Sequence, residues 1–311
     1  MENRRSVIIL ANPTSGRGRA IRTARAVASL LRARGADVAI HETTGSGDAE
    51  TFSRTQSRSE DRPGVIVACG GDGTIQQVVN ALAPLKPDLG DRCPVVGIAP
   101  AGRCNDFSHN LGIPGDPGRI ADILLTGTAR PVDLGQVNGR YYCTVVTVGI
   151  DADISSYVDT MKMPLRGTPA YIYGTLQVLR KYRGRSIRVS GDVDAFEQHV
   201  FLASTANTPS YGGAIGIVPH ASPFDGTLDF CLIDRLTRMR SVAMLVRVLR
   251  GTHVDRPEVH FAKAKQLRIE TDDPVDLWAD GERIGTTPAE INVAAGAVRI
   301  LLPSSTDART G

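Results

Sequence analysis

The sequence predicts an α/β domain built on a doubly wound parallel sheet, followed by an all-β sandwich domain. Before residue 131, apolar strands alternate with amphipathic helices, which is typical of a parallel sheet. After residues 131–133, short strand-like runs separated by turn signals outnumber the helices. The chain of 311 residues is also long for a single core. We expect an α/β domain at residues 1–132, with residues 297–311 as a candidate last piece of it, and a β-sandwich at residues 133–296.

Four apolar runs of the first domain are expected to be strands, and amphipathic segments between them helices. Gly35 is a suitable stop for the first helix, and Asp48 stands where it would cap the helix after the second strand. Ligands of such sheets bind beyond the carboxyl ends of the strands, so the loops there could converge on one ligand. The expected strands cover residues 6–11, 37–41, 65–69 and 95–99, and the expected helices include residues 19–34 and 74–83.

The run VIVACGGDGTIQQVV at residues 65–79 is the most informative stretch of the chain. A buried strand ends in Gly70, Gly71, Asp72 and Gly73, and a helix begins near Thr74. Backbone N–H groups at a helix N-terminus bind anions such as phosphate, and glycine lets the backbone approach the ligand. Asp72 would repel a phosphate unless a cation lay between them, so the stretch predicts a nucleotide–metal site. From the glycines alone, a plain strand–helix turn is an equally good interpretation.

The second domain is expected to consist of short strands with two helical insertions. Turn-forming pairs separate the strands, among them residues 191–192, 225–226 and 280–281. The expected strands cover residues 141–150, 186–190, 200–206, 228–233, 266–271, 275–279 and 298–302, and the expected helices cover residues 169–181 and 238–250.

Composition excludes several classes of protein. The net charge of +3 is too small to argue for nucleic acid as a partner. The five cysteines are scattered without a CxxC pair, so neither a disulfide framework nor a zinc site is indicated. The first apolar run is too short for a signal peptide, and no run approaches the roughly 18 apolar residues of a membrane span. We therefore expect a cytoplasmic protein.

Five motifs, in order along the chain, together resemble the diacylglycerol kinase catalytic family, which includes sphingosine kinases, ceramide kinases and bacterial lipid kinases. GGDGT alone also occurs in NAD kinases and phosphofructokinases, so the combination carries the specificity. The motifs are NPTSG at residues 12–16, GGDGT at 70–74 with Asn80 after it, PAGxxNDF at 100–107, DGTLD at 225–229 and DGE at 280–282.

The resemblance implies ATP as phosphoryl donor, held in a cleft between the domains. Short hydroxyls and backbone amides are also what triphosphate oxygens accept hydrogen bonds from. Without the family, ordinary turn chemistry would explain Thr14 and Ser15 equally well. The implied nucleotide contacts are Asn12, Pro13, Thr14, Ser15 and Gly16 in the first loop, Thr43 after the second strand, and the glycine run with the helix start, Gly70, Gly71, Asp72, Gly73, Thr74, Ile75 and Gln76.

Two metal sites follow from the resemblance. Asp72, Asp106 and Asp133 match an aspartate network that holds the catalytic Mg²⁺, and they stand in three strand-end loops of the expected fold. The alternatives are a helix cap for Asp106 and a turn at the domain junction for Asp133. A structural metal away from the chemistry would take the carboxylate of Asp225 and the backbone carbonyls of Ser222 and Thr227. Phe224 stands where relatives often carry an acidic residue.

The resemblance assigns Glu282 as the general base that accepts the proton of the lipid hydroxyl, with Asp280 beside it. From the residues alone, the segment WADGER at 278–283 predicts a β-hairpin whose two-residue turn is Asp280-Gly281.

The sequence departs from the family pattern at Arg103, which replaces the threonine usual in the third nucleotide loop. Either Arg103 makes a charge-assisted phosphate contact, or it points to solvent and ATP binds more weakly.

Two basic segments could place the protein on a membrane. Basic helices with an apolar face can lie on anionic headgroups. The alternative is that the apolar face packs on the sandwich while the arginines meet water. Residues 235–250 carry Leu236, Met239, Ala243, Val246 and Leu249 between arginines, and the basic residues 160–185 include Met161, Met163 and Leu165.

Taken together, the sequence and its resemblance predict an ATP- and Mg²⁺-dependent lipid kinase at the inner membrane face, with diacylglycerol as acceptor and phosphatidate as product. The alternatives are a sphingoid-base, ceramide or other lipid-alcohol kinase, an NAD-kinase-like activity, and a nucleotide-binding regulatory protein without turnover. Arg103 supports the last of these, whereas Asp72 and Glu282 argue against it. Both a monomer and a homodimer remain open.

Overall fold

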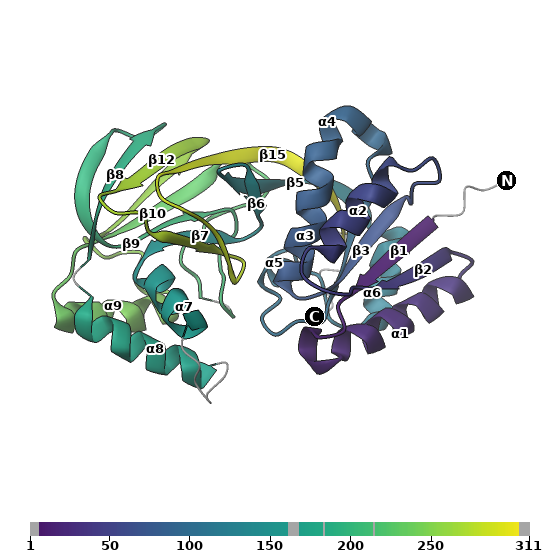
Figure 1. Ribbon diagram of the computed structural model, residues 1–311, viewed down its shortest axis with the longest axis horizontal. Coiled ribbons are helices and arrows are strands. Elements are labelled where there is room, and N and C mark those ends of the chain that lie inside the picture. The colour runs from purple at the N-terminus through teal and green to yellow at the C-terminus, as the bar shows by residue number, and fades with distance from the viewer. Residues whose placement is uncertain (1–5, 161–167, 183, 214, 305–311) are drawn as a thin grey trace. The chain divides into compact units, whose positions relative to one another are not determined.

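A computed structural model describes residues 6–160, 168–182, 184–213 and 215–304 of the chain (Figure 1). The chain forms two compact units. Unit 1 comprises Met1–Asp133 and Gly296–Gly311, and unit 2 comprises Leu134–Ala295. Two strands, β5 (Thr128–Val137) and β15 (Ala289–Leu302), therefore begin in one unit and end in the other.

Unit 1 contains the parallel sheet that the alternating pattern predicts. Its strand order is β4-β3-β1-β2, all parallel, and the end of β15 pairs with β4 through Ile300 and Val96. Helices α1 and α6 pack together, as do α2 and α3 (Figure 1). The strands are β1 (Ser6–Ala11), β2 (Asp37–Glu42), β3 (Val65–Gly70) and β4 (Val95–Pro100), and the helices are α1 (Arg19–Ala33), α2 (Asp48–Arg58), α3 (Asp72–Leu82), α4 (Lys86–Leu89), α5 (Asp106–Asn110) and α6 (Pro117–Thr126).

The core of unit 1 follows from the spacing of its small and branched side chains. In α1, Ala20, Ala24, Val27 and Leu31 lie on one face at helical spacing and are fully buried. They pack on the β-branched residues of β1 and β3 and on one face of α6. The helix ends shortly before Gly35, whose φ of +84° explains the stop predicted there.

The expectation that Asp48 caps α2 is wrong. The N-cap position is Gly47, and Asp48 is the first residue of the helix. Its Oδ2 instead accepts a hydrogen bond of 2.8 Å from the backbone N of Thr44 and lies 3.1 Å from Nε2 of His41. The carboxylate therefore reaches back into the loop after β2 and leaves the helix amides uncapped by a side chain.

Unit 2 is antiparallel and β-sandwich-like, which confirms the second half of the expected fold class. The main order is β14-β13-β7-β9-β8-β12-β15, and β10 joins β9 to β11. Its strands are β6 (Arg140–Tyr142), β7 (Val145–Gly149), β8 (Arg185–Gly191), β9 (Phe196–Ala206), β10 (Leu228–Asp234), β11 (Val259–Ala264), β12 (Gln266–Thr271), β13 (Asp276–Ala279) and β14 (Glu282–Thr286), and its helices are α7 (Ile150–Thr160), α8 (Thr168–Lys181) and α9 (Arg238–Leu249).

Two hydrophobic clusters lie in unit 2. One fills the space among the strands, and the other joins β9 and β10 to the helices. In α9, only Ser241, Met244 and Val248 are buried. Within the described part of the chain, no helix is long and apolar enough to cross a membrane.

Candidate active site

The loop after β1 is ordered by its own side chains. The Oδ1 atom of Asn12 accepts hydrogen bonds from the backbone N of Thr14 at 3.0 Å and from its Oγ1 at 2.8 Å. The backbone N of Asn12 donates to the carbonyl of Cys69 at 3.1 Å, which ties the loop to the end of β3. Pro13 stands between these contacts, and Ser15 begins a short 3₁₀ turn. The turn chemistry expected for Thr14 is therefore present, and its hydroxyl donates within the loop.

Glycines bring three loops of unit 1 into close backbone contact. A methyl group at Gly16, which has a φ of +57°, would overlap the carbonyl oxygen of Ala101. A methyl group at Gly102 would overlap the Cα of Gly71. The carbonyl oxygen of Gly70 accepts hydrogen bonds from the backbone N of Ala101 at 2.7 Å and of Gly102 at 3.0 Å. The glycines thus allow the predicted nucleotide loops to meet at the carboxyl edge of the sheet.

Arg19, at the start of α1, was not predicted from the sequence. Its Nε donates to the carbonyl oxygen of Ala101 at 3.3 Å, and its Nη2 donates to that of Gly102. The guanidinium thereby joins the first loop to the third. No local pattern marks such a contact, because the partners lie more than 80 positions apart.

The amides of the glycine run are not all free for a phosphate. Helix α3 begins at Asp72, two residues earlier than expected, with Gly71 as its N-cap. The backbone N atoms of Thr74 and Ile75 both donate to the carbonyl of Gly71, at 3.0 and 3.2 Å. These two amides belong to the first helical turn, which differs from the expectation that they bind nucleotide. The side chains of Thr74, Ile75 and Gln76 are buried.

Thr43 lies directly after β2, beside the first loop. Its backbone N donates to the carbonyl of Ala11 at 2.9 Å, and the residue is buried. Asp48 fixes the next residue, Thr44, and the ring of His41 stacks on Phe52 with centroids 3.8 Å apart. The loop after β2 is therefore held by contacts on both sides of Thr43.

Asp72 and Asp106 lie close together, and Asp133 lies in strand β5. The Oδ1 atom of Asp72 accepts a hydrogen bond of 3.1 Å from the backbone N of Phe107, next to Asp106. Burial raises the pKa of Asp72, the Phe107 amide opposes this, and the negative charge of Asp106 raises it further. Asp133 lies inside strand β5, and not in a loop as expected, and its Oδ1 accepts from the backbone N of Gly296 at 2.6 Å.

The donor chemistry at Asp72 and Asp106 fits a magnesium ion bound together with a nucleotide. Mg²⁺ commonly uses one or two carboxylates, with phosphate oxygens and water as the other ligands. A cation would also relieve the repulsion that raises the pKa of Asp72. Among the described residues, no three His, Cys, Asp or Glu side chains form a group that could hold a metal by themselves. The three-aspartate network stays a prediction, and Asp72 with Asp106 is the part of it that the structure brings together.

Arg103 projects from the third loop and is exposed. In the part of the chain that the structure describes, its guanidinium has no hydrogen bond or ion pair. Asn105 holds this loop in place, because its Oδ1 accepts from the backbone N of Gly102 at 2.8 Å. The neighbouring Cys104 is the one exposed thiol among the five cysteines, all of which are described.

In unit 2, the hairpin predicted around Asp280-Gly281 is confirmed. Ala279 pairs with Glu282, and the two turn residues have φ values of +53° and +81°. Glu282 is the first residue of β14 and is exposed. The carboxylate of Asp280 accepts three hydrogen bonds from residues 143–144. These come from the backbone N of Cys143 at 2.7 Å, the backbone N of Thr144 at 2.9 Å and the Oγ1 of Thr144 at 2.6 Å.

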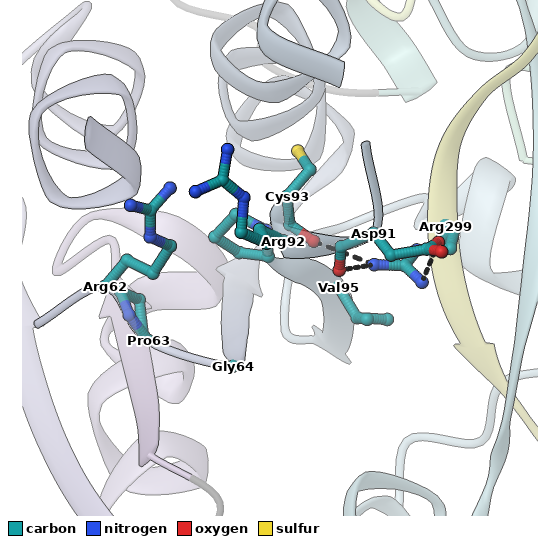
Figure 2. Close-up of a pocket in the computed structure, with 9 residues that line it drawn as sticks. Arg62, Pro63, Gly64, Asp91, Arg92, Cys93, Val95 and Arg299 are labelled. Carbon is teal, nitrogen blue, oxygen red and sulfur yellow. Dashed lines mark hydrogen bonds and ion pairs between the residues drawn. The ribbon is translucent and has the colours of Figure 1, made fainter. Parts of the chain in front are cut away.

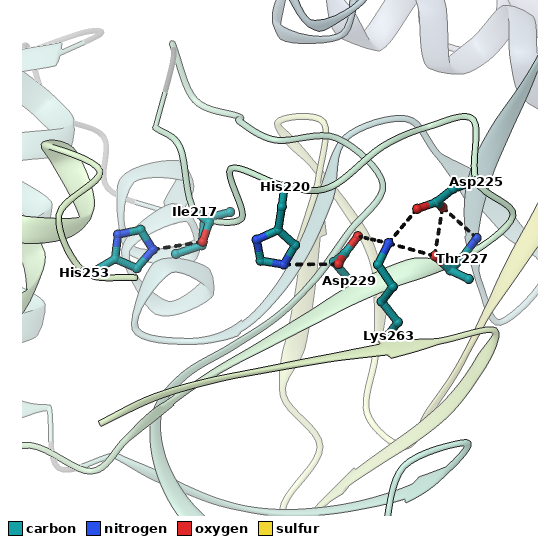
Figure 3. Close-up of polar contacts among 7 residues, drawn as sticks. All are labelled: Ile217, His220, Asp225, Thr227, Asp229, His253 and Lys263. Carbon is teal, nitrogen blue, oxygen red and sulfur yellow. Dashed lines mark hydrogen bonds and ion pairs between the residues drawn. The ribbon is translucent and has the colours of Figure 1, made fainter. Parts of the chain in front are cut away.

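The loop with the predicted structural metal site already contains a cation (Figure 3). The Nζ atom of Lys263 lies 2.6 Å from Oδ2 of Asp225 and 3.6 Å from Oδ2 of Asp229. Burial opposes ionisation of Asp225, but hydrogen bonds from Lys263 and Thr227 lower its pKa overall. Ser222 is half-buried at the start of this loop. The residues present do not fit a divalent metal, since an ammonium group occupies the position beside the carboxylate.

A cavity of about 440 Å³ lies at the opposite edge of the unit 1 sheet, before β3 and β4 begin (Figure 2). None of the sequence-predicted site residues lines it. One of its arginines, Arg299, is bonded to Asp91 Oδ1 at 3.1 Å and to the carbonyls of Asp91 and Cys93. The cavity is therefore separate from the candidate nucleotide site. Its lining consists of Arg62, Pro63, Gly64, Asp91, Arg92, Cys93, Pro94, Val95 and Arg299.

Comparison with known proteins covers both units. Residues 6–137 match the family described as diacylglycerol kinase catalytic domain, and residues 144–302 match the YegS C-terminal NAD kinase beta sandwich-like domain. A diacylglycerol kinase of Bacillus subtilis is 30% identical over 296 residues, which cover 95% of both chains. One from Mycobacterium tuberculosis is 30% identical over 305 residues, covering 96% of this chain and 95% of the relative.

Solved structures share the fold. A crystal structure from Bacillus anthracis has a TM-score of 0.80 at 23% identity and covers 98% of both chains. A diacylglycerol kinase from the same organism has a TM-score of 0.72 at 22% identity, over 98% of this chain and 99% of the other. The two-unit fold is therefore shared with these proteins over almost the whole chain.

Proposed function

Because the chain belongs to the diacylglycerol kinase family, we propose that it transfers the γ-phosphoryl group of ATP to the hydroxyl of a lipid. Diacylglycerol is the proposed acceptor and phosphatidate the product, by analogy with the names of the relatives. The observation that carries the proposal is the meeting of three loops in unit 1, at Gly16, Gly71 and Gly102. Positioning and charge stabilisation account for most of the catalysis of phosphoryl transfer, so an ordered loop cluster suits this reaction.

Unit 1 would hold the donor. The loops around Asn12 and Gly102 would contact the phosphates, and Asp72 with Asp106 would hold Mg²⁺. When bound, Mg²⁺ supplies neutralisation of charge on the β- and γ-phosphate oxygens. The hydrogen bond from the Phe107 amide fixes the rotamer of Asp72 before the nucleotide arrives. Such prior ordering reduces the entropy lost on binding.

Unit 2 would supply the general base. Glu282 is exposed at the start of β14, so its carboxylate can receive the proton of an incoming hydroxyl. Asp280 acts as a positioning residue, because its oxygens are bonded to Cys143 and Thr144 and fix the hairpin that carries Glu282. Replacing Glu282 by glutamine removes the base while keeping the shape of the side chain.

Arg103 is proposed to contact the phosphates of ATP, since its guanidinium lies exposed beside the glycine-rich loops. The variant Arg103→Thr should then show a large rise in the KM for ATP. An unchanged or lower KM would reject this contact. Arg119, whose side chain has no hydrogen bond or ion pair among the described residues, offers the matched control Arg119→Thr.

The exposed face of α9 supports contact with an anionic membrane. Met239, Val246 and Leu249 are 84%, 41% and 56% exposed, so the alternative that the apolar side chains pack on the sandwich does not apply to these three. Leu236 is partly buried. Arginines 238, 240, 247 and 250 lie in or next to the same helix, and basic apolar faces bind acidic lipids. Met161, Met163 and Leu165 lie outside the described residues.

Sedimentation with lipid vesicles tests the membrane proposal. The wild type should bind vesicles containing phosphatidylglycerol more strongly than vesicles of phosphatidylcholine alone. The double variant Met239→Ser and Leu249→Ser should lose most of this binding, because both side chains are exposed and contribute little to the core. Equal binding of the wild type to both vesicle types would reject the electrostatic part of the proposal.

Incubation with γ-labelled ATP, Mg²⁺ and separate mixed micelles of diacylglycerol, sphingosine and ceramide tests the activity. The expected result is labelled phosphatidate, lost in Glu282→Gln and retained in the control Glu290→Gln, whose carboxylate pairs with Arg268 at 3.0 Å. Labelling of another lipid would assign a different acceptor. ATP binding without labelling of any lipid would instead indicate a nucleotide-binding protein without turnover.

A further inference from the structure

Strand β10 contains, close to its start, a nearly buried carboxylate that needs a positive partner. The side chain of Asp229, in β10, is only 2% exposed. A carboxylate removed from water in this way is costly unless a cation or several donors compensate it. Its Oδ1 lies 3.3 Å from Nε2 of His220, and its Oδ2 lies 3.6 Å from Nζ of Lys263 (Figure 3).

The strand register fixes Lys263 at this place. Strands β10 and β11 are antiparallel, and Asp229 is the direct cross-strand partner of Lys263. Side chains of directly opposite residues lie on the same face of a sheet. The ammonium group of Lys263 therefore lies at the carboxylate of Asp229 through the backbone register and does not depend on a chance surface contact.

The same ammonium group reaches the loop residue that was expected to bind a metal. Its Nζ donates to Oδ2 of Asp225 at 2.6 Å and to Oγ1 of Thr227 at 3.3 Å. The other oxygen of Asp225 accepts from the backbone N of Thr227 at 3.0 Å and from its Oγ1 at 2.8 Å. Both oxygens of Asp225 are thus engaged, and the ammonium group donates to two oxygens while it forms an ion pair with Oδ2 of Asp229 at 3.6 Å.

A divalent ion bound to Asp225 would lie next to this ammonium group, and the two positive charges would repel each other. Mg²⁺ and Ca²⁺ lie about 2.0–2.6 Å from their oxygen ligands, and Nζ of Lys263 lies 2.6 Å from Oδ2 of Asp225. We propose that Lys263 is the resident cation of this loop. Its ammonium group links the loop to strand β10, so unit 2 needs no structural divalent metal here. Lys263 holds Asp225 and Asp229 together as a metal would, with a single positive charge.

Thermal melting without nucleotide tests the proposal independently of the kinase activity. The proteins compared are the wild type, Asp225→Asn, Lys263→Met, Lys263→Arg and the control Lys265→Met, which removes an exposed ammonium two residues away. Each is melted in EDTA, in MgCl₂ and in CaCl₂. The wild type and Asp225→Asn should respond equally to the metals, because the wild-type site does not accept them.

Lys263→Met should lower Tm in EDTA by about 5 °C or more relative to Lys265→Met, since the nearly buried Oδ2 of Asp229 loses the ammonium group beside it. CaCl₂ or MgCl₂ should restore part of this loss, because Asp225 and Asp229 then face a space without a cation. Lys263→Arg keeps the charge and should remain insensitive to the metals.

Two results would overturn the proposal. The first is a rise in the wild-type Tm with MgCl₂ or CaCl₂ that is larger than the rise in Asp225→Asn. The second is a Lys263→Met protein that melts in EDTA at the temperature of Lys265→Met. Neither result bears on whether ATP and lipid are substrates, so a failure here is distinct from a failure of the proposed function.

Discussion

The hairpin that carries Glu282 depends on the carboxylate of Asp280. Asp280→Asn keeps the size of the side chain, and asparagine tolerates the left-handed conformation that a φ of +53° requires. The substitution removes the charge and one acceptor oxygen, so one of the amides of Cys143 and Thr144 faces an NH₂ group. A hydrogen bond to a charged group contributes about 1.5–3 kcal/mol. We therefore expect a loss of about 2–3 kcal/mol in the free energy of unfolding of unit 2.

For a unit of this size, each kcal/mol lowers Tm by about 2–4 °C, so Asp280→Asn should melt about 4–12 °C lower. Differential scanning calorimetry measures this change, with Asp273→Asn as a control at an exposed turn of the same unit. Glu282→Gln should change Tm by less than about 1 °C, because surface substitutions rarely matter, while kcat falls by about 100-fold or more. The reasoning is refuted if Asp280→Asn melts like Asp273→Asn but loses turnover as Glu282→Gln does. Asp280 would then act on the substrate and not on the hairpin.

Three further predictions concern unit 1. Gly102→Ala should weaken ATP binding by at least about 10-fold in a calorimetric titration, because its methyl group would overlap Gly71 and separate the loops. Cys104 should be the thiol that Ellman's reagent labels first in the native protein, because the other four thiols are buried, although burial and the nearby Asp106 raise its pKa. MgATP should slow this labelling if the third loop binds phosphate. The hydrogen bond from the Thr44 amide lowers the pKa of Asp48 in the folded state. The stabilisation that this lowered pKa gives is present above the pKa of Asp48 in the unfolded chain, and it is lost as the pH falls through the pKa in the folded protein. The free energy of unfolding of Asp48→Asn should therefore fall less steeply with decreasing pH below about pH 4.

Local patterns predicted the elements that local physics determines. The alternation of apolar strands and amphipathic helices predicted the parallel sheet, because β3 and β4 are almost continuous buried runs. The Asp280-Gly281 turn was predictable because two successive residues with positive φ favour this pair of residue types. The start of α3 was placed two residues late, since Asp72 was read as part of the loop.

Other features have no local signal. The segment VHFAKA, which forms β11, mixes apolar and polar residues and was not predicted as a strand. Unless β11 is predicted, the pairing of Lys263 with Asp229 across the two strands cannot be predicted either. The sequence then offers no cation beside Asp225 and favours a metal there. The contact between Arg19 and Ala101 was missed for the same reason, because it joins residues 82 positions apart. Strand pairing and long-range side-chain contacts are set by tertiary packing, which a linear pattern does not contain.

The candidate nucleotide site separates residues that build the loops from residues that face solvent. The loops are ordered by the chain itself, because hydrogen bonds to backbone groups engage the side chains of Asn12, Arg19 and Asn105. Arg103 is exposed and has no hydrogen bond or ion pair among the described residues. Because the scaffold is already bonded, a ligand there would not have to supply the free energy of ordering the backbone. It follows that substituting Arg103 should change affinity with little effect on stability, whereas substituting Arg19 should reduce both.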